Sequence, residues 1–172
     1  MRYILFGVAG LLVIGGLVAS SASAQTATAE LRNAQGEAVG TASLTEAPQA
    51  VRILLTIAKL PPGRHGIHIH AVGTCDPPSF ASAGGHFNPT GKQHGWMNPA
   101  GAHAGDLPNL VVGADGAAQV EVYAPHVTLA DGPESLLQPA GTAVVIHAGP
   151  DDEATDPAGN SGNRIACGVI HK

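Results

Sequence analysis

The sequence is poor in aromatic side chains, in charge and in cysteine. Only 3% of its 172 residues are aromatic and only 12% are charged, whereas there are 23 glycines and 13 prolines. This composition argues against long helices and favours short elements separated by many turns. The length fits a single domain, and no change of composition divides the chain further. We therefore expect one mostly β domain with one core.

The only long apolar run lies at the N-terminus. Met1 and Arg2 precede an apolar stretch over residues 3–18, and small residues ending in Ala22-Ser23-Ala24 follow it. The pattern is typical of a signal peptide, residues 1–24, with a mature domain of residues 25–172. The alternative is an uncleaved anchor, but the run is shorter than the roughly 20 residues of a membrane span. We expect an exported protein, periplasmic or extracellular, with no stable membrane insertion after cleavage.

Positive charge is scarce in the mature chain, which has 7 lysines and arginines against 13 acidic residues, a net charge of −6 with histidine neutral. This balance gives no basic surface for nucleic acid, so we expect no such partner. The two cysteines, Cys75 and Cys167, belong to an exported chain in which disulfides persist, and we expect them to pair. Two buried free thiols are the alternative.

Apolar residues alternate with others in several short segments. Val51, Ile53, Leu55 and Ile57 occupy every second position, which is the period of a half-buried strand. Shorter stretches of the same kind cover residues 26–31, 39–44, 119–123 and 143–147. Turn-forming sequences separate these segments, so the sequence predicts an antiparallel sandwich or barrel. Two long stretches, residues 74–106 and 148–164, do not fit strands, and loops of such length are usually functional or disordered.

Histidine is unevenly distributed, and its spacing indicates metal binding. His68 and His70 lie two residues apart in an apolar segment, so a strand would place both imidazoles on one face. The first long loop adds His86, His94, His103 and Asp106, three imidazoles and a carboxylate of the kind that form a closed zinc shell. His147 could join His68 and His70 in an imidazole-rich site with an open position, which suits copper.

With these residues in place, the sequence resembles the Cu,Zn superoxide dismutase family over most of the mature chain. The matching segments include His65-Gly66-Ile67-His68-Ile69-His70, Gly84-Gly85-His86-Phe87-Asn88-Pro89, His103-Ala104-Gly105-Asp106-Leu107 and the run from Gly159 to Ile170. The resemblance implies an all-β fold, an eight-stranded antiparallel Greek-key barrel or sandwich with long metal-site loops and one disulfide. It implies conversion of superoxide to oxygen and hydrogen peroxide by alternate reduction and reoxidation of copper.

The resemblance also assigns roles to individual residues. It implies copper held by His68, His70, His86 and His147, and zinc held by His86, His94, His103 and Asp106, with His86 bridging the two metals. Arg164 and His86 would take part in catalysis, Arg164 by binding the substrate anion. Asp151 would accept hydrogen bonds from His68 and His94, and Cys75 and Cys167 would match the family disulfide.

The second long loop departs from the pattern of many eukaryotic members of the family. Those members carry lysine in this loop, where it helps to guide superoxide, but residues 148–163 here contain no lysine or arginine. The loop has four acidic residues instead, Asp151, Asp152, Glu153 and Asp156. Either the metal and Arg164 attract the substrate alone, or a lysine from elsewhere, such as Lys92 or Lys59, substitutes.

Two other functions fit parts of the sequence. One is a non-catalytic copper- and zinc-binding or copper-delivery relative, although such relatives often lose a ligand or the arginine and this chain has all of them. The other is a structural sandwich tied by a disulfide, with incidental histidines. The sequence leaves a homodimer open.

Overall fold

The structure, a computed structural model, describes residues 24–172. Apart from Ala24, the signal peptide expected over residues 1–24 lies outside this range and stays a prediction. No helix in the described range is long and apolar enough to cross a membrane. The described elements are one short 3-10 helix, Ala81–Ala83, and nine strands: β1 (Thr26–Asn33), β2 (Ala38–Ala47), β3 (Ala50–Ile57), β4 (Gly63–His65), β5 (Ile67–His70), β6 (Leu110–Val112), β7 (Ala118–Ala124), β8 (Ala143–His147) and β9 (Arg164–Val169).

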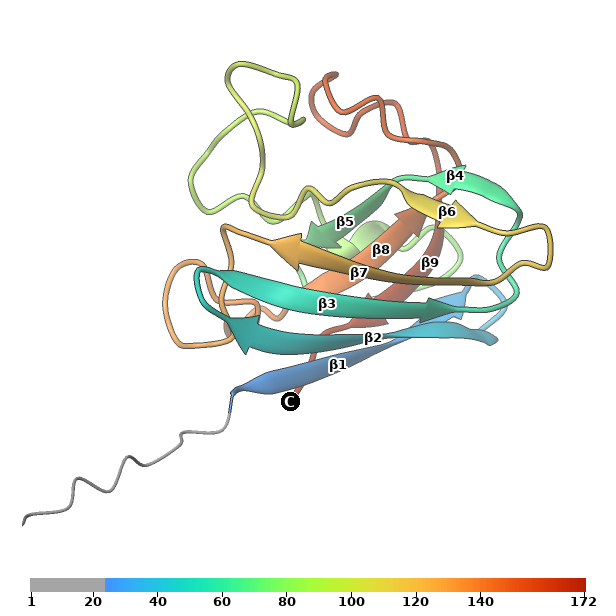
Figure 1. Cartoon of the computed structure of the whole chain (residues 1–172), viewed down its shortest axis with the longest axis horizontal. Helices are drawn as coiled ribbons and strands as arrows, with labels where there is room; N and C mark the ends of the chain where they lie inside the picture. Colours follow the sequence, from blue (N-terminus) through green and yellow to red (C-terminus); the bar gives the residue numbers. More distant parts are fainter. Residues whose placement is uncertain (1–23) are drawn as a thin grey trace, which may run out of the picture.

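Seven of these strands form one antiparallel sheet in the order β5-β8-β9-β1-β2-β3-β7, and β4 pairs with β6 in a second, small sheet. The large sheet curls, so that β5, β8 and β9 lie behind β2, β3 and β7 in Figure 1. The core fills the space between, with side chains from both parts such as Leu31, Ile53, Leu55, Ile69 and Ile146. The all-β fold expected from the sequence is confirmed.

The alternation of apolar residues in the sequence determines which face of the central strand β3 is buried. Val51, Ile53 and Leu55 are fully buried, while the residues between them are partly exposed. β3 pairs along its full length with β2 on one side and from Val51 to Ile57 with β7 on the other. The strand therefore has one face in the core and one face toward solvent, as its period of two requires.

The strand count differs from the eight that the resemblance implies, because the segment around the first histidines is interrupted at Gly66. Gly63–His65 pairs with β6, whereas Ile67–His70 pairs with β8. Between them the amide of Gly66 donates to the carbonyl of Gly149, and its own carbonyl accepts from the amide of His147. A Cβ at this position would approach the Cβ of Ser161 to 2.8 Å. Only glycine therefore fits where the chain passes from one sheet to the other.

Two long connections extend over one side of the sheet and contact each other. They follow β5 and β8, and Figure 1 draws them close together beyond β4 and β6. The amide of Met97 donates to the carbonyl of Glu153 at 2.9 Å, and the amide of His94 to the carboxylate of Asp156 at 2.6 Å. Both loops were expected from the sequence. A third long connection, residues 125–142, has no strand either and was not predicted from the sequence.

A small second core holds the first long loop against the outer face of β8 and β9. Phe80 and Ala83 from the loop pack with Ala143 and Val145 of β8 and with Cys167 of β9. The expected disulfide joins Cys75 to Cys167 beside this cluster. Loop residues 75–84 are thus fixed to the sheet both by a covalent bond and by buried apolar contacts.

Candidate metal centre

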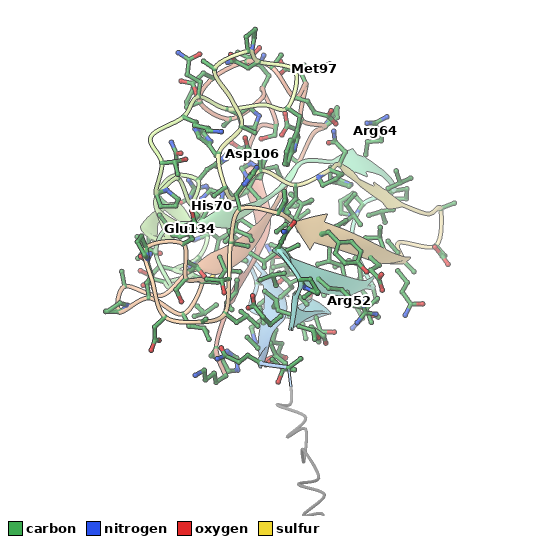
Figure 2. All side chains as sticks on the ribbon, turned by 60° about the vertical axis from the view of Figure 1, so that its left-hand side comes forward. Arg52, Arg64, His70, Met97, Asp106 and Glu134 are labelled. Atoms are coloured by element: carbon green, nitrogen blue, oxygen red, sulfur yellow. A yellow bond between two sulfur atoms is a disulfide. The ribbon has the colours of Figure 1, made fainter. Side chains whose placement is uncertain are left out.

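The first histidine pair lies on a strand whose two faces differ. Ile67 and Ile69 of β5 point into the main core, and His68 and His70, which are also buried, occupy the alternate positions. The first long loop runs beside this strand, where His68 is bridged to Asp106 and His70 to His86 by backbone pairing. On the other side of β5, strand β8 ends at His147. Figure 2 shows His70 and Asp106 inside the molecule, whereas Met97 lies at the outer tip of the loop.

Four imidazoles converge on one point. One nitrogen from each of His68, His70, His86 and His147 belongs to a group whose members all lie within 4.8 Å of one another. Within residues 24–172, four buried side-chain nitrogens have no hydrogen-bond partner: His68 Nδ1, His70 Nε2, His86 Nε2 and His147 Nε2. Each of the four histidines contributes one of them. Buried polar atoms without a partner are rare and costly, so their convergence needs an explanation.

The opposite nitrogen of three of these rings fixes which tautomer is present. His68 Nε2 lies 2.8 Å from a carboxylate oxygen of Asp151, His70 Nδ1 lies 2.9 Å from the carbonyl of Gly84, and His147 Nδ1 lies 3.0 Å from the carbonyl of Gly162. These oxygens can only accept, so the three named nitrogens carry the hydrogen and donate. The remaining nitrogens therefore present lone pairs toward one another, as ligands of a metal ion do.

A second set of atoms surrounds one carboxylate oxygen. Asp106 Oδ1 lies 2.9 Å from His86 Nδ1, 2.9 Å from His94 Nδ1 and 3.3 Å from His103 Nδ1. His103 Nδ1 is also 3.3 Å from His86 Nδ1. Three imidazole nitrogens thus lie within 3.3 Å of one carboxylate oxygen, which is a donor set of the kind that binds zinc. The other oxygen of Asp106 accepts from the amides of Gly95 and His103, which orients the carboxylate.

A purely geometric grouping puts His68 with His86, His94 and Asp106 in this second set. We assign His103 to the set instead, because His68 Nε2 already donates to Asp151 and His68 Nδ1 faces the four-histidine group. His86 is then the one residue with a nitrogen in each set. The structure therefore brings together the eight ligand positions that the sequence predicts in two sets sharing His86.

Asp151 contacts one histidine of each set. Its carboxylate accepts from His68 Nε2 at 2.8 Å and from His94 Nε2 at 3.0 Å. Asn109, which was not predicted from the sequence, holds the backbone of Asp151: its side-chain oxygen accepts from the amide of Asp151, and its side-chain nitrogen donates to the carbonyl of Asp151. An asparagine in a loop carries no sequence signal for such a contact.

Burial dominates the electrostatics of the four-histidine group. It lowers the pKa of His68 to about 3, of His70 to about 2 and of His147 to about 4, and the neighbouring charge of Arg164 further lowers the pKa of His70 and His147. In His94 burial acts in the same direction, but its bonds to Asp106 and Asp151 outweigh it and raise the pKa to about 9. At neutral pH the four-histidine group therefore keeps its lone pairs free.

Arg164 begins β9 beside these histidines. Its guanidinium donates to the carbonyls of Phe80 and Gly84, each at 2.6 Å. The carbonyl of Gly84 also accepts from His70 Nδ1, so one backbone group orients both a histidine of the site and the arginine. The sequence indicated Arg164, but it gave no sign of the carbonyls that hold it, because backbone partners depend on the folded chain and not on residue type.

Comparisons with known proteins agree with this geometry. The sequence model of the family described as copper/zinc superoxide dismutase matches residues 38–170. The chain is 53% identical over 146 residues to Cu-Zn superoxide dismutase 2 of Aquifex aeolicus, covering 84% of this chain and 85% of that protein. It is 44% identical over 148 residues to the Cu-Zn superoxide dismutase of Caulobacter vibrioides, covering 84% and 85%.

Among solved structures, a superoxide dismutase-like protein of Bacillus subtilis superposes with a TM-score of 0.81 at 44% identity, covering 83% of this chain and 96% of that one. The fold, the two sets of ligand atoms and the match over most of the sequence point the same way. The chain belongs to the copper/zinc superoxide dismutase family.

Proposed function

We propose that the chain converts superoxide to oxygen and hydrogen peroxide, with copper held by His68, His70, His86 and His147 and zinc held by His86, His94, His103 and Asp106. The observation that carries the proposal is the convergence of four buried, unpartnered imidazole nitrogens beside a fixed arginine. Four imidazoles suit copper, and three imidazoles with one carboxylate suit zinc. The donor sets therefore fit the metals that name the family.

His68, His70, His86 and His147 would hold copper, which would supply one-electron chemistry to the site. Arg164 binds the substrate anion next to this site, where a fixed positive charge in a partly buried position is most effective. His86 Nε2, the nitrogen that faces the four-histidine group, holds and releases a proton only while it is not a metal ligand. His86 Nδ1 stays beside Asp106, so the ring keeps its position while the proton moves.

Metal analysis combined with a superoxide-removal assay tests the proposal. We expect purified mature protein to bind about one copper and one zinc per chain and to remove superoxide catalytically. Full metal content without activity would favour the second candidate, a copper- and zinc-binding relative without turnover. This second candidate is supported by the 44% identity to a Bacillus subtilis protein described only as superoxide dismutase-like.

The role of Arg164 is tested by Arg164→Ala. We expect the variant to retain both metals, because Arg164 donates only to backbone carbonyls and contributes no atom to either ligand set. We expect its second-order rate with superoxide to fall by about tenfold or more, within the range that local charge adds to the encounter of small ions. A wild-type rate with full copper and zinc would show that Arg164 does not bind the substrate.

We place the mature protein outside the cytoplasm. The disulfide between Cys75 and Cys167 supports this location, because such bonds persist in oxidising compartments, and so does the N-terminal sequence pattern. Mass analysis of the secreted product should find an N-terminus at Gln25. The homodimer that the sequence leaves open stays a prediction, to be checked by sedimentation.

A further inference from the structure

One histidine of the two ligand sets lacks an oxygen partner for its outer nitrogen. Four of the others place that nitrogen on a carboxylate or carbonyl oxygen: His68, His70, His94 and His147. His86 has a nitrogen in each set. His103 has Nδ1 beside Asp106, and within residues 24–172 its Nε2 makes no hydrogen bond. With Nδ1 as a zinc ligand, the hydrogen of the His103 ring is on this Nε2.

The carboxylate of Asp156, in the loop after β8, is the acidic group beside this nitrogen. Its Oδ1 lies 3.8 Å from His103 Nε2, and the same oxygen accepts from the amide of His94 at 2.6 Å. A separation of 3.8 Å is longer than a hydrogen bond, but it places a negative charge next to the ring. Asp156 thus contacts both histidines that belong to the second ligand set alone.

No basic side chain of the same loop neutralises Asp156. Residues 148–163 contain no lysine or arginine, and among the ion pairs of the described residues Asp156 is paired only with His103. The exposed fraction of its side chain is 46%, so water screens part of its charge. A carboxylate beside the N–H of a metal-binding imidazole orients the ring and makes it a better donor to the metal. Asp156 can therefore support His103 through its charge.

The turn that carries Asp156 is closed and is held against the first long loop. The amide of Gly159 donates to the carbonyl of Thr155 at 2.7 Å, which closes the turn around Asp156. From the first long loop, the amide of Met97 donates to the carbonyl of Glu153 at 2.9 Å. These backbone bonds fix the carboxylate at the edge of the second ligand set.

We propose that Asp156 is a positioning residue for zinc, which holds the backbone of His94 and orients the imidazole of His103 through its charge. The inference rests on the proposed zinc set, because Asp156 can act on the metal only if His103 is a zinc ligand. Within the described part of the chain, Asp156 bonds to no member of the four-histidine group, so its effect is confined to zinc. This role differs from that of Asp151, which contacts a histidine of each set.

The first measurement compares the zinc affinities of Asp156→Asn and Asp131→Asn by competition with a chelator. Asparagine keeps a side-chain oxygen for the amide of His94 and removes the charge beside His103, whereas Asp131→Asn removes an exposed charge in the connection from β7 to β8. We expect zinc affinity to fall about three- to tenfold in Asp156→Asn, a modest loss because water screens this carboxylate. Asp131→Asn should bind zinc as wild type does, and both variants should keep the copper affinity of wild type.

The zinc content of the wild-type protein decides whether the proposed ligand set itself is right. A wild-type protein that binds no zinc would overturn both the zinc set and the role of Asp156. Zinc binding by wild type, with equal affinities in Asp156→Asn and Asp131→Asn, would overturn the role of Asp156 alone. Parallel losses of zinc and copper in Asp156→Asn would also overturn it, because the variant would then have disturbed the loops as a whole.

A second measurement follows the ring of His103 by nuclear magnetic resonance in the reduced, diamagnetic holoprotein. In Asp156→Asn, the N–H at His103 Nε2 should exchange with water severalfold faster than in wild type and should resonate at a lower frequency, because it has lost a charged neighbour. The N–H groups at Nδ1 of His70 and His147 are internal controls, since backbone carbonyls hold them. An unchanged His103 signal would show that the carboxylate does not act on this ring.

Discussion

The proton on each imidazole determines what the centre can bind. An Asp or backbone oxygen fixes the hydrogen of His68, His70 and His147 on the outer nitrogen, and burial keeps the inner nitrogen unprotonated. The free energy needed to keep four lone pairs buried and unpartnered comes from the rest of the fold. Metal binding then recovers this cost, so the fold and the two ions are thermodynamically linked.

His86 is the residue through which the fold is most strongly linked to the binding of both metal ions. It has one nitrogen in each ligand set, whereas His147 has a nitrogen only in the four-histidine group. We therefore expect His86→Ala to lower the content of both metals, and His147→Ala to lower mainly copper. Elemental analysis of the two variants after the same reconstitution provides the comparison. Full copper and zinc in His86→Ala would show that the ring is not shared.

Asp151 should matter for both metals although it belongs to neither ligand set. Asp151→Leu keeps the branched shape of the side chain but removes the acceptor for His68 and His94, and loss of such a partner typically weakens metal affinity by about 10- to 100-fold. Competition with a chelator measures the change. Asp152→Asn is the matched control, since the exposed carboxylate of Asp152 bonds only to Ala154, Thr155 and Asn160. Equal affinities in both variants would show that Asp151 does not support the ligands.

At the scale of elements, the disulfide loop links the sheet to the site. Replacing Cys75 and Cys167 with serine opens a covalent loop with a sequence separation of 92, for which chain entropy gives an upper figure of about 4–5 kcal/mol of stability. Because the same loop supplies the carbonyl that holds His70 and Arg164, copper affinity should fall more than zinc affinity. Denaturant unfolding and metal titration measure the two effects. An unchanged unfolding midpoint would mean that the second core alone holds the loop.

The sequence predicted some elements well and others incompletely, for physical reasons. Strand β3 was predictable because its alternating apolar residues face one core. The break at Gly66 was not, because it depends on Gly149 and Ser161, which are distant in sequence. The residues of the two proposed ligand sets could be predicted from their spacing and from the family resemblance. The support of Asp151 by Asn109, and of Arg164 by the carbonyls of Phe80 and Gly84, requires three-dimensional proximity that residue types do not encode.

At the scale of the whole molecule, the buried histidines make the stability of the metal-free protein depend on pH. A histidine whose folded pKa lies far below its unfolded value of about 6.5 binds more protons when unfolded, so stability falls as the pH drops from 6.5 toward the folded pKa. His68, His70 and His147, with pKa values of about 3, 2 and 4, all act in this direction. Each proton contributes a slope of up to about 1.4 kcal/mol per pH unit.

His94 has the opposite effect. Its folded pKa of about 9 means that its stabilising contribution is complete below pH 6.5 and is lost as the pH rises through 9. The metal-free protein should therefore be most stable near pH 6.5, with stability falling on both sides. In the metal-loaded protein His94 Nδ1 would be occupied by zinc, so the decline above pH 6.5 attributed to His94 should disappear. Urea unfolding midpoints between pH 4.5 and 9.5, measured with and without metals, test both expectations, and a metal-free protein equally stable at pH 4.5 and 6.5 would show that these imidazoles are not held neutral by burial.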